Sequence, residues 1–294
     1  MSRTLTSRTG TPAAGRSPSA GRVLAIGVRR GLLELRQLLR TPREAFTLLS
    51  TPLLFILLST MTDGDIPGST VPMADLMVAG GITTMIVQAG LLTLTQTLAV
   101  EREDGTLLRM RAVRHGIPAY LVAKTVVVTL TALGGIALTL AAGVLVVGSS
   151  PPADLRHWLI LLSVTALGLV AVVPVGAVLG AILPNAREAL GFLMIPLLAL
   201  MVFSGIYFPM TKLPTAVQDV VQAFPLKWTA QGVRAAVLPD SALSAETAGS
   251  WELPKVYLIN GAWAVMGFLL APRVLHRMTR RASGNRPKRT EASS

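Results

Sequence analysis

The chain has 294 residues, of which 51% are hydrophobic and 14% are charged, whereas about 25% of residues are charged in an average soluble domain. It contains no cysteine, which excludes disulfide frameworks and thiolate metal sites, and its three scattered histidines do not suggest a metal cluster. A net charge of +12 would suggest nucleic acid as the partner of a soluble protein, but the long apolar runs indicate a membrane protein whose basic residues hold its cytoplasmic loops in place.

Residues 1–21 are rich in Ser, Thr, Arg, Gly and Pro without an apolar period, so we predict a disordered cytoplasmic tail. The tail is not a secretory signal, because a basic helical stretch follows it instead of a short apolar core. Residues 22–41 alternate apolar residues with arginines, which favours an amphipathic helix lying on the inner membrane surface over a plain solvated helix. Thr41 can cap the next helix, with Pro42 at its first position and Glu44 completing a capping box.

Long apolar runs follow, and they predict an all-α polytopic membrane protein with six transmembrane helices in a domain covering residues 42–280. Residues 210–253 hold two helical patterns too short to cross, which we interpret as re-entrant or surface-lying helices on the outer side. Residues 281–294 form a basic cytoplasmic tail. The predicted spans cover about residues 45–61, 72–100, 119–147, 158–183, 189–207 and 256–275.

The Lys and Arg residues are distributed unevenly between the two sides that six spans would create. One side receives 22 of the 27, and it includes both ends of the chain. Cytoplasmic loops carry such an excess, so we predict that the N- and C-termini are cytoplasmic. Lys124, near the start of the third span, lies within snorkelling distance of this inner surface.

The second span is unusually polar. Gln88 and Thr95 lie seven residues apart, which suits one face of a helix, and polar side chains in a span often face a translocation path. Hydrogen bonding between helices explains them about equally well. In the fourth span, Gly176 and Gly180 have a spacing that permits close helix contact.

The densest cluster of charge among the spans is residues 101–114. We predict that Glu101 to Asp104 end the second span, that Gly105 breaks the helix in a left-handed turn, and that Thr106 caps a short separate helix. Two interpretations stay open at this point: a helix that docks on another protein, or a basic loop that only enforces topology. The docking surface would consist of Leu107, Leu108 and Met110, rimmed by Arg109, Arg111 and Arg114.

Motifs for catalysis are absent from the sequence. There is no H-E-x-x-H, no G-x-S-x-G and no G-x-x-x-x-G-K-[ST], so the chain cannot hydrolyse ATP through a P-loop and we do not expect an enzyme. The one carboxylate within a predicted span, Asp75, lies near the outer end of the second, and the lack of a carboxylate deeper in a span argues against a gradient-driven secondary transporter or channel. An intramembrane enzyme ranks last.

ABC-2 type transporter permeases, near the daunorubicin-resistance branch, carry an E-R-E-x-G-T-L signature that resembles Glu101-Arg102-Glu103-Asp104-Gly105-Thr106-Leu107. The family's segment after the fifth span is similar to Ser204-Gly205-Ile206-Tyr207-Phe208-Pro209 with Leu213-Pro214, and its next motif to Pro225-Leu226-Lys227-Trp228. Lys124 matches a basic residue common at the start of the third span. The resemblance covers about residues 22–280.

The resemblance implies the membrane subunit of an ATP-binding cassette exporter in a bacterial plasma membrane. Two permease chains, identical or different, would pair with two ATP-binding subunits, which hold ATP and Mg²⁺; this chain would need no cofactor and bind no nucleic acid. The loop after the second span would be the coupling helix that docks on the partner. The residues that match this coupling region are Glu101, Arg102, Glu103, Gly105, Thr106, Leu107 and Arg109.

Two departures from the family pattern imply a different matching surface on the partner. Leu108 stands where the family often has Glu, and Arg114-His115-Gly116 stands near the place of an expected Thr-Pro. The expected cargo is a hydrophobic drug or antibiotic, as in multidrug export, and the alternatives of the same architecture are a lipid or a polysaccharide.

Overall fold

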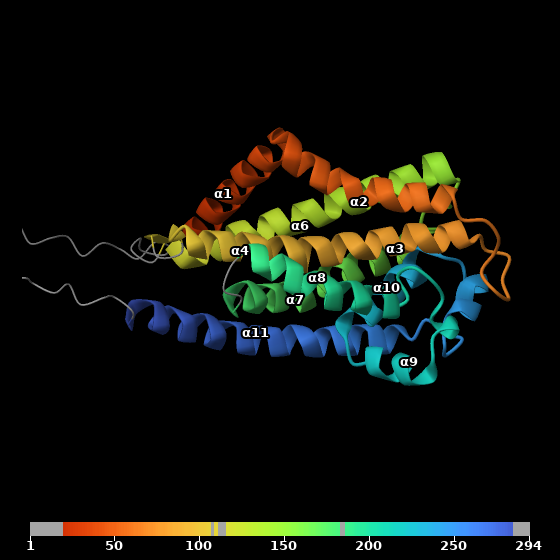
Figure 1. Cartoon of the computed structure of the whole chain (residues 1–294). Helices are drawn as coiled ribbons and strands as arrows, with labels where there is room; N and C mark the ends of the chain where they lie inside the picture. The colour runs from red at the N-terminus through yellow and green to blue at the C-terminus, as the bar shows by residue number, and fades with distance from the viewer. Residues whose placement is uncertain (1–19, 107–108, 111–115, 183–185, 285–294) are drawn as a thin grey trace, which may run out of the picture.

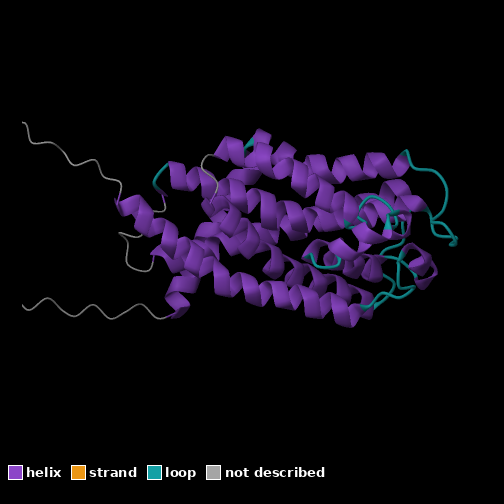
Figure 2. Cartoon of the chain, turned by 60° about the horizontal axis from the view of Figure 1, so that its bottom comes forward, coloured by secondary structure: helices purple, strands orange, loops and turns teal. Residues whose placement is uncertain are grey.

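The computed structural model describes residues 20–106, 109–110, 116–182 and 186–284, and the regular elements in these ranges are all helices. The long helices run roughly along one axis, while helix α1 (Ala20–Arg40) is inclined to the others (Figure 1). Most of the loops gather at one end, and the beginning of α1 and the end of α11 (Leu253–Gly284) lie at the other (Figures 1 and 2). The predicted all-α multi-pass architecture is therefore confirmed.

One long rod consists of three consecutive helical segments. Helix α3 (Met73–Val87) continues through the π-helical segment η1 (Gln88–Thr93) into α4 (Leu94–Glu103). The other long helices are α2 (Pro42–Thr60), α6 (Gly116–Ala142) with the π-helical η2 (Gly143–Val147), α7 (Leu155–Ile182) and α8 (Ala186–Phe203).

Four helices among the described residues are long and apolar enough to cross a membrane. They are Met73–Glu103, Ala119–Val147, Leu155–Gly180 and Leu253–Leu270. Helix α8 contains a shorter apolar stretch, Met194–Phe203. Helix α2 is not among the four. Six spans therefore stay a prediction, although each predicted span coincides with a helix.

The rod of α3, η1 and α4 lies at the centre of the bundle, and its residues Ile82, Ile86 and Ala99 are fully or almost fully buried. Helix α7 packs against it at the predicted small residues. A Cβ atom on Gly176 would lie 2.7 Å from the carbonyl oxygen of Gly90, and one on Gly180 would lie 2.7 Å from that of Thr95. The expected close contact is confirmed, because only glycine leaves room for these carbonyls.

Helix α1 packs along α6 through two glycines of its own. Cβ atoms on Gly27 and Gly31 would lie 2.8 Å from the carbonyl oxygens of Ala119 and Ala123. On its other side α1 exposes large apolar residues, including Leu24 and Leu32, together with Arg29 and Arg36. Helix α1 is thus a packed part of the bundle, and its position on the inner membrane surface stays a prediction.

The corner between α1 and α2 differs from the predicted capping box. Pro42 occupies the first position of α2 and Thr41 is the cap residue, but its side chain makes no capping hydrogen bond. Instead the Thr41 hydroxyl donates to the carbonyl oxygen of Gln37 in the preceding helix, 3.0 Å away. Helix α1 ends directly before α2 begins, so the carbonyls at its last turn compete for the same hydroxyl.

The segment between α8 and α11 contains η3 (Met210–Lys212), α9 (Thr215–Val221), α10 (Pro225–Val237) and η4 (Asp240–Ala245). Helix α9 is mostly exposed, whereas every residue of α10 except the last is buried, against α7, α11 and α3. The two short patterns therefore have different environments: α9 lies on the surface, and α10 lies inside the bundle.

Candidate functional site

The predicted break after the second span is present. Gly105 has a φ of +68°, in the left-handed region, and Arg109 donates its backbone N–H to the Gly105 carbonyl oxygen at 3.1 Å. The Arg109 guanidinium also donates to the carbonyl oxygen of Asp104 at 2.9 Å, which satisfies one of the free carbonyls at the end of α4. Thr106, Arg109 and Met110 are helical; Leu107, Leu108 and residues 111–115 lie outside the described residues.

Glu101 lies just before this break and takes part in a group of charges that we call the Lys124 cluster: Glu34, Glu101, Tyr120 and Lys124. The Lys124 ammonium forms ion pairs with Glu101, at 2.8 Å, and with Glu34, and Tyr120 donates its hydroxyl to the second carboxylate oxygen of Glu101. These residues come from α1, α4 and α6. The cluster therefore joins the amphipathic helix to the end of the central rod.

Lys124 does not snorkel toward the surface, as its position near the end of a span predicted. It is only 5% exposed, and its ammonium lies between two carboxylates instead of reaching water. Glu34 lies about two helix turns before the end of the predicted surface helix, and nothing in the sequence marked it as the partner of Lys124. Sequence alone contained no signal for this pair, because 90 residues separate the two side chains.

Helix α1 also reaches the segment beyond Gly105. Arg30 donates to the sulfur atom of Met110 at 3.0 Å, and its guanidinium lies 5.7 Å from the ring centroid of Tyr120. The remaining predicted coupling residues are positioned nearby: Arg102 and Thr106 are half-buried, and Glu103 is exposed. The turn, the Lys124 cluster and α1 thus form one connected unit at this end of the bundle.

The two candidate path residues do not face a common space. Gln88 is half-buried and accepts a hydrogen bond from Thr51 of α2, whereas Thr95 is buried and donates to the Gly176 carbonyl oxygen of α7 at 3.0 Å. The reason is the π-helical segment between them. A π-helical turn contains about one more residue than an α-helical turn, so a spacing of seven no longer returns to the same face.

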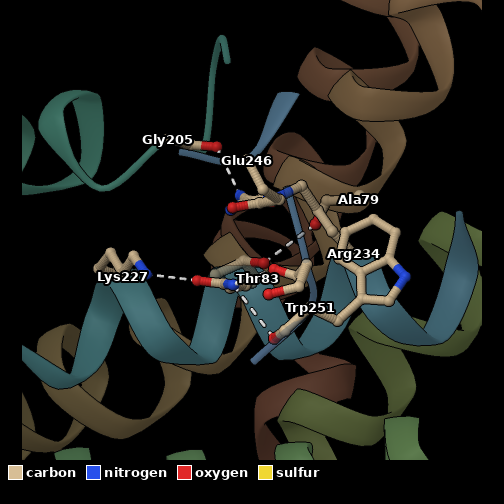
Figure 3. Close-up of polar contacts among 9 residues, drawn as sticks. Ala79, Thr83, Gly205, Lys227, Arg234, Glu246 and Trp251 are labelled. Atoms are coloured by element: carbon tan, nitrogen blue, oxygen red, sulfur yellow. Dashed lines mark hydrogen bonds and ion pairs between the residues drawn. The ribbon is translucent and has the colours of Figure 1, made fainter. Parts of the chain in front are cut away.

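A second polar group, which we call the Arg234 cluster, lies at the opposite end of the bundle: Lys227, Gln231, Arg234 and Glu246. Figure 3 shows Arg234 between Glu246 and the Gly205 carbonyl; the Arg234 side chain donates to them at 2.5 Å and 2.7 Å. Lys227 donates to Gln231, whose amide donates in turn to the carbonyl oxygens of Ser250 and Trp251. All four side chains are at most 4% exposed.

The Arg234 cluster explains the sequence motif of residues 204–209. Gly205 has a φ of +75° and ends α8 in a left-handed turn, and its carbonyl is held by Arg234. The next carbonyl, of Ile206, packs against Gly80, where a Cβ atom would lie 2.2 Å away. The sequence gives no signal for Arg234 and Glu246, because a lone arginine and a lone glutamate in a polar segment are usually solvated.

The Lys124 cluster, the Arg234 cluster and the Gly105 turn do not by themselves define an activity. The similarity of the chain to known proteins identifies its family. A sequence model of ABC-2 type transporters matches residues 30–238, which run from the middle of α1 to the residue after α10. The matched range covers more than half of the chain and contains Gly105, the whole Lys124 cluster and all of the Arg234 cluster except Glu246. A search of curated proteins found no significant match.

Proposed function

Because the chain belongs to the ABC-2 type transporter family, whose members are permease subunits without an ATP site of their own, we propose that it is the membrane subunit of an exporter of hydrophobic compounds, such as drugs or an antibiotic. A separate ATP-binding subunit would bind ATP and Mg²⁺ and hydrolyse the ATP. The absence of a P-loop in the sequence is consistent with this division of labour.

The observation that carries the coupling part of the proposal is the turn at Gly105. The central rod ends there, a short helix begins, and Glu101 is tied to Lys124 immediately before it. A movement of the partner against this short helix would be transmitted to the rod, since the Gly105 turn directly follows the end of α4, which carries Glu101. Leu107 belongs to the docking surface in this proposal.

The orientation follows from charge and from the position of the chain ends. We assign the Gly105 end to the cytoplasm, because helix α1, which carries five arginines, begins at this end (Figure 1) and Arg109 follows directly after the turn. Six spans, with α2 and α8 as the first and fifth, return α11 to the same side. Helix α10 is then re-entrant from the outer side of a bacterial plasma membrane.

Assembly as two permeases with two ATP-binding subunits is the arrangement we propose, with the permeases identical or different. Large apolar side chains are exposed along α2 and α8, including Phe46, Leu53, Ile195 and Leu198. In a membrane these faces contact lipid or another permease chain.

The proposal is tested with inside-out membrane vesicles that contain this chain and the ATP-binding subunit that co-purifies with it. We expect a hydrophobic fluorescent dye to accumulate when ATP is added, and not when ATP is replaced by a non-hydrolysable analogue. Full transport by this chain alone in ATP-free vesicles would contradict the proposal. Labelled lipid and polysaccharide, offered to the same vesicles, distinguish the other cargo classes.

A further inference from the structure

A small cavity lies beside the π-helical segment, away from both clusters. It has a volume of about 40 Å³ and is bounded by α1, α2, the central rod and α6. Its polar lining consists of Glu44, Thr47, Gln88, Thr93 and Thr131. A cavity needs about 10–15 Å³ to hold one water molecule, so this one has room for a group the size of an ammonium with a water beside it.

The Thr131 hydroxyl is an unpartnered polar group in the wall of the cavity. Thr131 is 8% exposed, and its oxygen is buried without a hydrogen-bond partner among the described residues. Other threonines of α6 behave differently: Thr125 and Thr139 donate to the carbonyl oxygens four residues earlier, at 3.0 Å and 2.8 Å. A buried hydroxyl without a partner is unfavourable, so an occupant of the cavity would provide what the protein does not.

The cavity favours a cation that donates hydrogen bonds. Glu44 is an exposed residue of the lining, and its carboxylate forms no ion pair within the described ranges. No Lys, Arg or His lines the cavity. The oxygen of the Gln88 amide already accepts from Thr51, and its nitrogen makes only a long contact of 3.4 Å with the Thr47 carbonyl. The groups left for an occupant are therefore the carboxylate and hydroxyl oxygens, which accept from an ammonium.

The position of the cavity suggests how such a cation arrives. Leu38, Leu48 and Met85 form the apolar part of its wall, and next to the wall in sequence Leu39 and Leu49 are exposed large apolar residues. In the proposed orientation the corner between α1 and α2 lies toward the inner leaflet. An amphiphile could place its charged head in the cavity while its apolar part stays in lipid.

We propose that this cavity binds the ammonium head of a hydrophobic primary amine, with Glu44 as counter-charge and Thr131 as hydrogen-bond acceptor. The inference rests on the proposed function and deepens it, since it names hydrophobic amines as a substrate class. The π-helical segment is the structural device that builds the site, because its wide turn carries both Gln88 and Thr93 into the lining.

The test uses the purified full-length permease in phosphatidylcholine nanodiscs, without nucleotide, and radiolabelled dodecylamine as the probe. We expect saturable binding of dodecylamine and none of dodecanol, which has the same chain and no charge. Glu44→Gln should weaken dodecylamine binding at least about tenfold, the effect of losing one charge-assisted hydrogen bond. Asp63→Asn, which removes an exposed carboxylate elsewhere, should leave the affinity unchanged.

Thr131→Val separates a binding role from a structural one. Valine has nearly the same shape, so the unpaired hydroxyl disappears and the thermal midpoint should stay the same or rise, while the affinity for dodecylamine falls several-fold. Thr125→Val, at an exposed position of the same helix, is the matched control. A higher midpoint with unchanged affinity would overturn the proposal, as would unchanged binding by Glu44→Gln.

Three further outcomes are decisive. If potassium chloride displaces dodecylamine at millimolar concentration and does so only when Glu44 is intact, the site holds an inorganic cation and the ammonium proposal is overturned. If dye export continues unchanged in Glu44→Gln vesicles and amine export does too, the cavity is not a substrate site while the exporter proposal stands. Saturable amine binding without any ATP-dependent export would contradict the proposed function and keep the site.

Discussion

Lys124 is the residue on which the Gly105 end of the molecule depends most directly. One ammonium neutralises two carboxylates that come from different helices, and the Glu34 and Glu101 side chains are themselves only 30% and 19% exposed. Removing the ammonium would leave both negative charges facing each other in a place with little water. We therefore expect Lys124→Met to reduce the free energy of unfolding by about 2–4 kcal/mol, measured by SDS titration from mixed micelles.

The matched control for Lys124 is a lysine in an exposed ion pair. Lys255, which pairs with Glu252, is 57% exposed at its side chain, and Lys255→Met should change the free energy of unfolding by less than about 1 kcal/mol. Equal effects of the two substitutions would contradict a structural role for the Lys124 cluster. A Glu34→Gln variant adds a second check, since it keeps one of the two ion pairs and should cost less than Lys124→Met.

Lys227, in the Arg234 cluster, should make the stability of the folded protein depend on pH. Burial lowers the pKa of Lys227 from 10.5 to about 8, although the negative charges of Glu246 and Glu252 act in the opposite direction. Between pH 8 and 10.5 the folded protein therefore holds this side chain neutral while the unfolded chain still binds the proton. Stability should rise with pH across this window, because the unfolded state binds more protons there.

The measurement is the thermal midpoint of the permease in detergent between pH 7 and pH 10. The wild-type midpoint should rise with pH through the alkaline window, and Lys227→Met should flatten the rise because the titrating group is gone. Lys212→Met, at an exposed lysine outside the cluster, should keep the wild-type slope. A slope that survives in Lys227→Met would assign the pH dependence to another group.

At the scale of the elements, the turn between α4 and the following short helix depends on glycine. The left-handed conformation of Gly105 costs an alanine roughly 1–2 kcal/mol, although its Cβ would meet nothing within 4 Å. Gly105→Ala should consequently leave insertion intact and reduce ATP-dependent dye export several-fold, as vesicle transport would measure. Gly105→Asn should retain more export, because asparagine tolerates this conformation.

Gly64 is the matched control for the turn. It has a φ of +85° and equally open surroundings, but it lies in the loop between α2 and α3 at the other end of the bundle. Gly64→Ala introduces the same backbone strain without touching the proposed docking region. If both substitutions reduce export equally, strain alone explains the loss and the coupling role of Gly105 fails.

Contact between α7 and the central rod gives a second prediction for the elements. A methyl group on Gly176 would press on the Gly90 carbonyl, so Gly176→Ala should destabilise the protein by about 1–3 kcal/mol in SDS titration. Gly134→Ala provides the contrast, because its Cβ would have nothing within 4 Å and alanine favours a helix by up to about 1 kcal/mol. Opposite signs are expected; a loss of stability in both would argue against specific packing at Gly176.

How far the sequence predicts these elements depends on the range of the interaction involved. The turn at Gly105 and the glycines of α7 were predicted, because a glycine after a charged helix end and a small-residue spacing are local signals. The separation of Gln88 from Thr95 was not, since nothing in the composition of residues 88–93 announces a π-helical turn. The burial of α10 was left open because its apolar pattern is weak and its surroundings come from distant helices.

At the scale of the whole molecule, the sequence predicts which helices exist more readily than how they associate. Composition and hydropathy predicted a helix for each span, with ends within a few residues of those observed except in α11, which continues to Gly284, nine residues past the predicted end. The packing of α1 on α6, with Lys124 between Glu34 and Glu101, joins segments about 90 residues apart and has no counterpart in periodicity. The same holds for Arg234 and the Gly205 carbonyl, which define the opposite end.

The membrane topology of the whole molecule can be tested directly, because the chain contains no cysteine and any introduced thiol is unique. Thr70 and Asp104 are both exposed, Thr70 in the loop before α3 and Asp104 at the end of α4, so the entire central rod separates them. We expect a membrane-impermeant maleimide to label Thr70→Cys in intact cells, and Asp104→Cys only after permeabilisation. The cysteine-free parent chain controls for background labelling. Labelling of both thiols in intact cells would contradict a rod that crosses the membrane, and the reverse pattern would invert the orientation that places Gly105 and the Lys124 cluster in the cytoplasm.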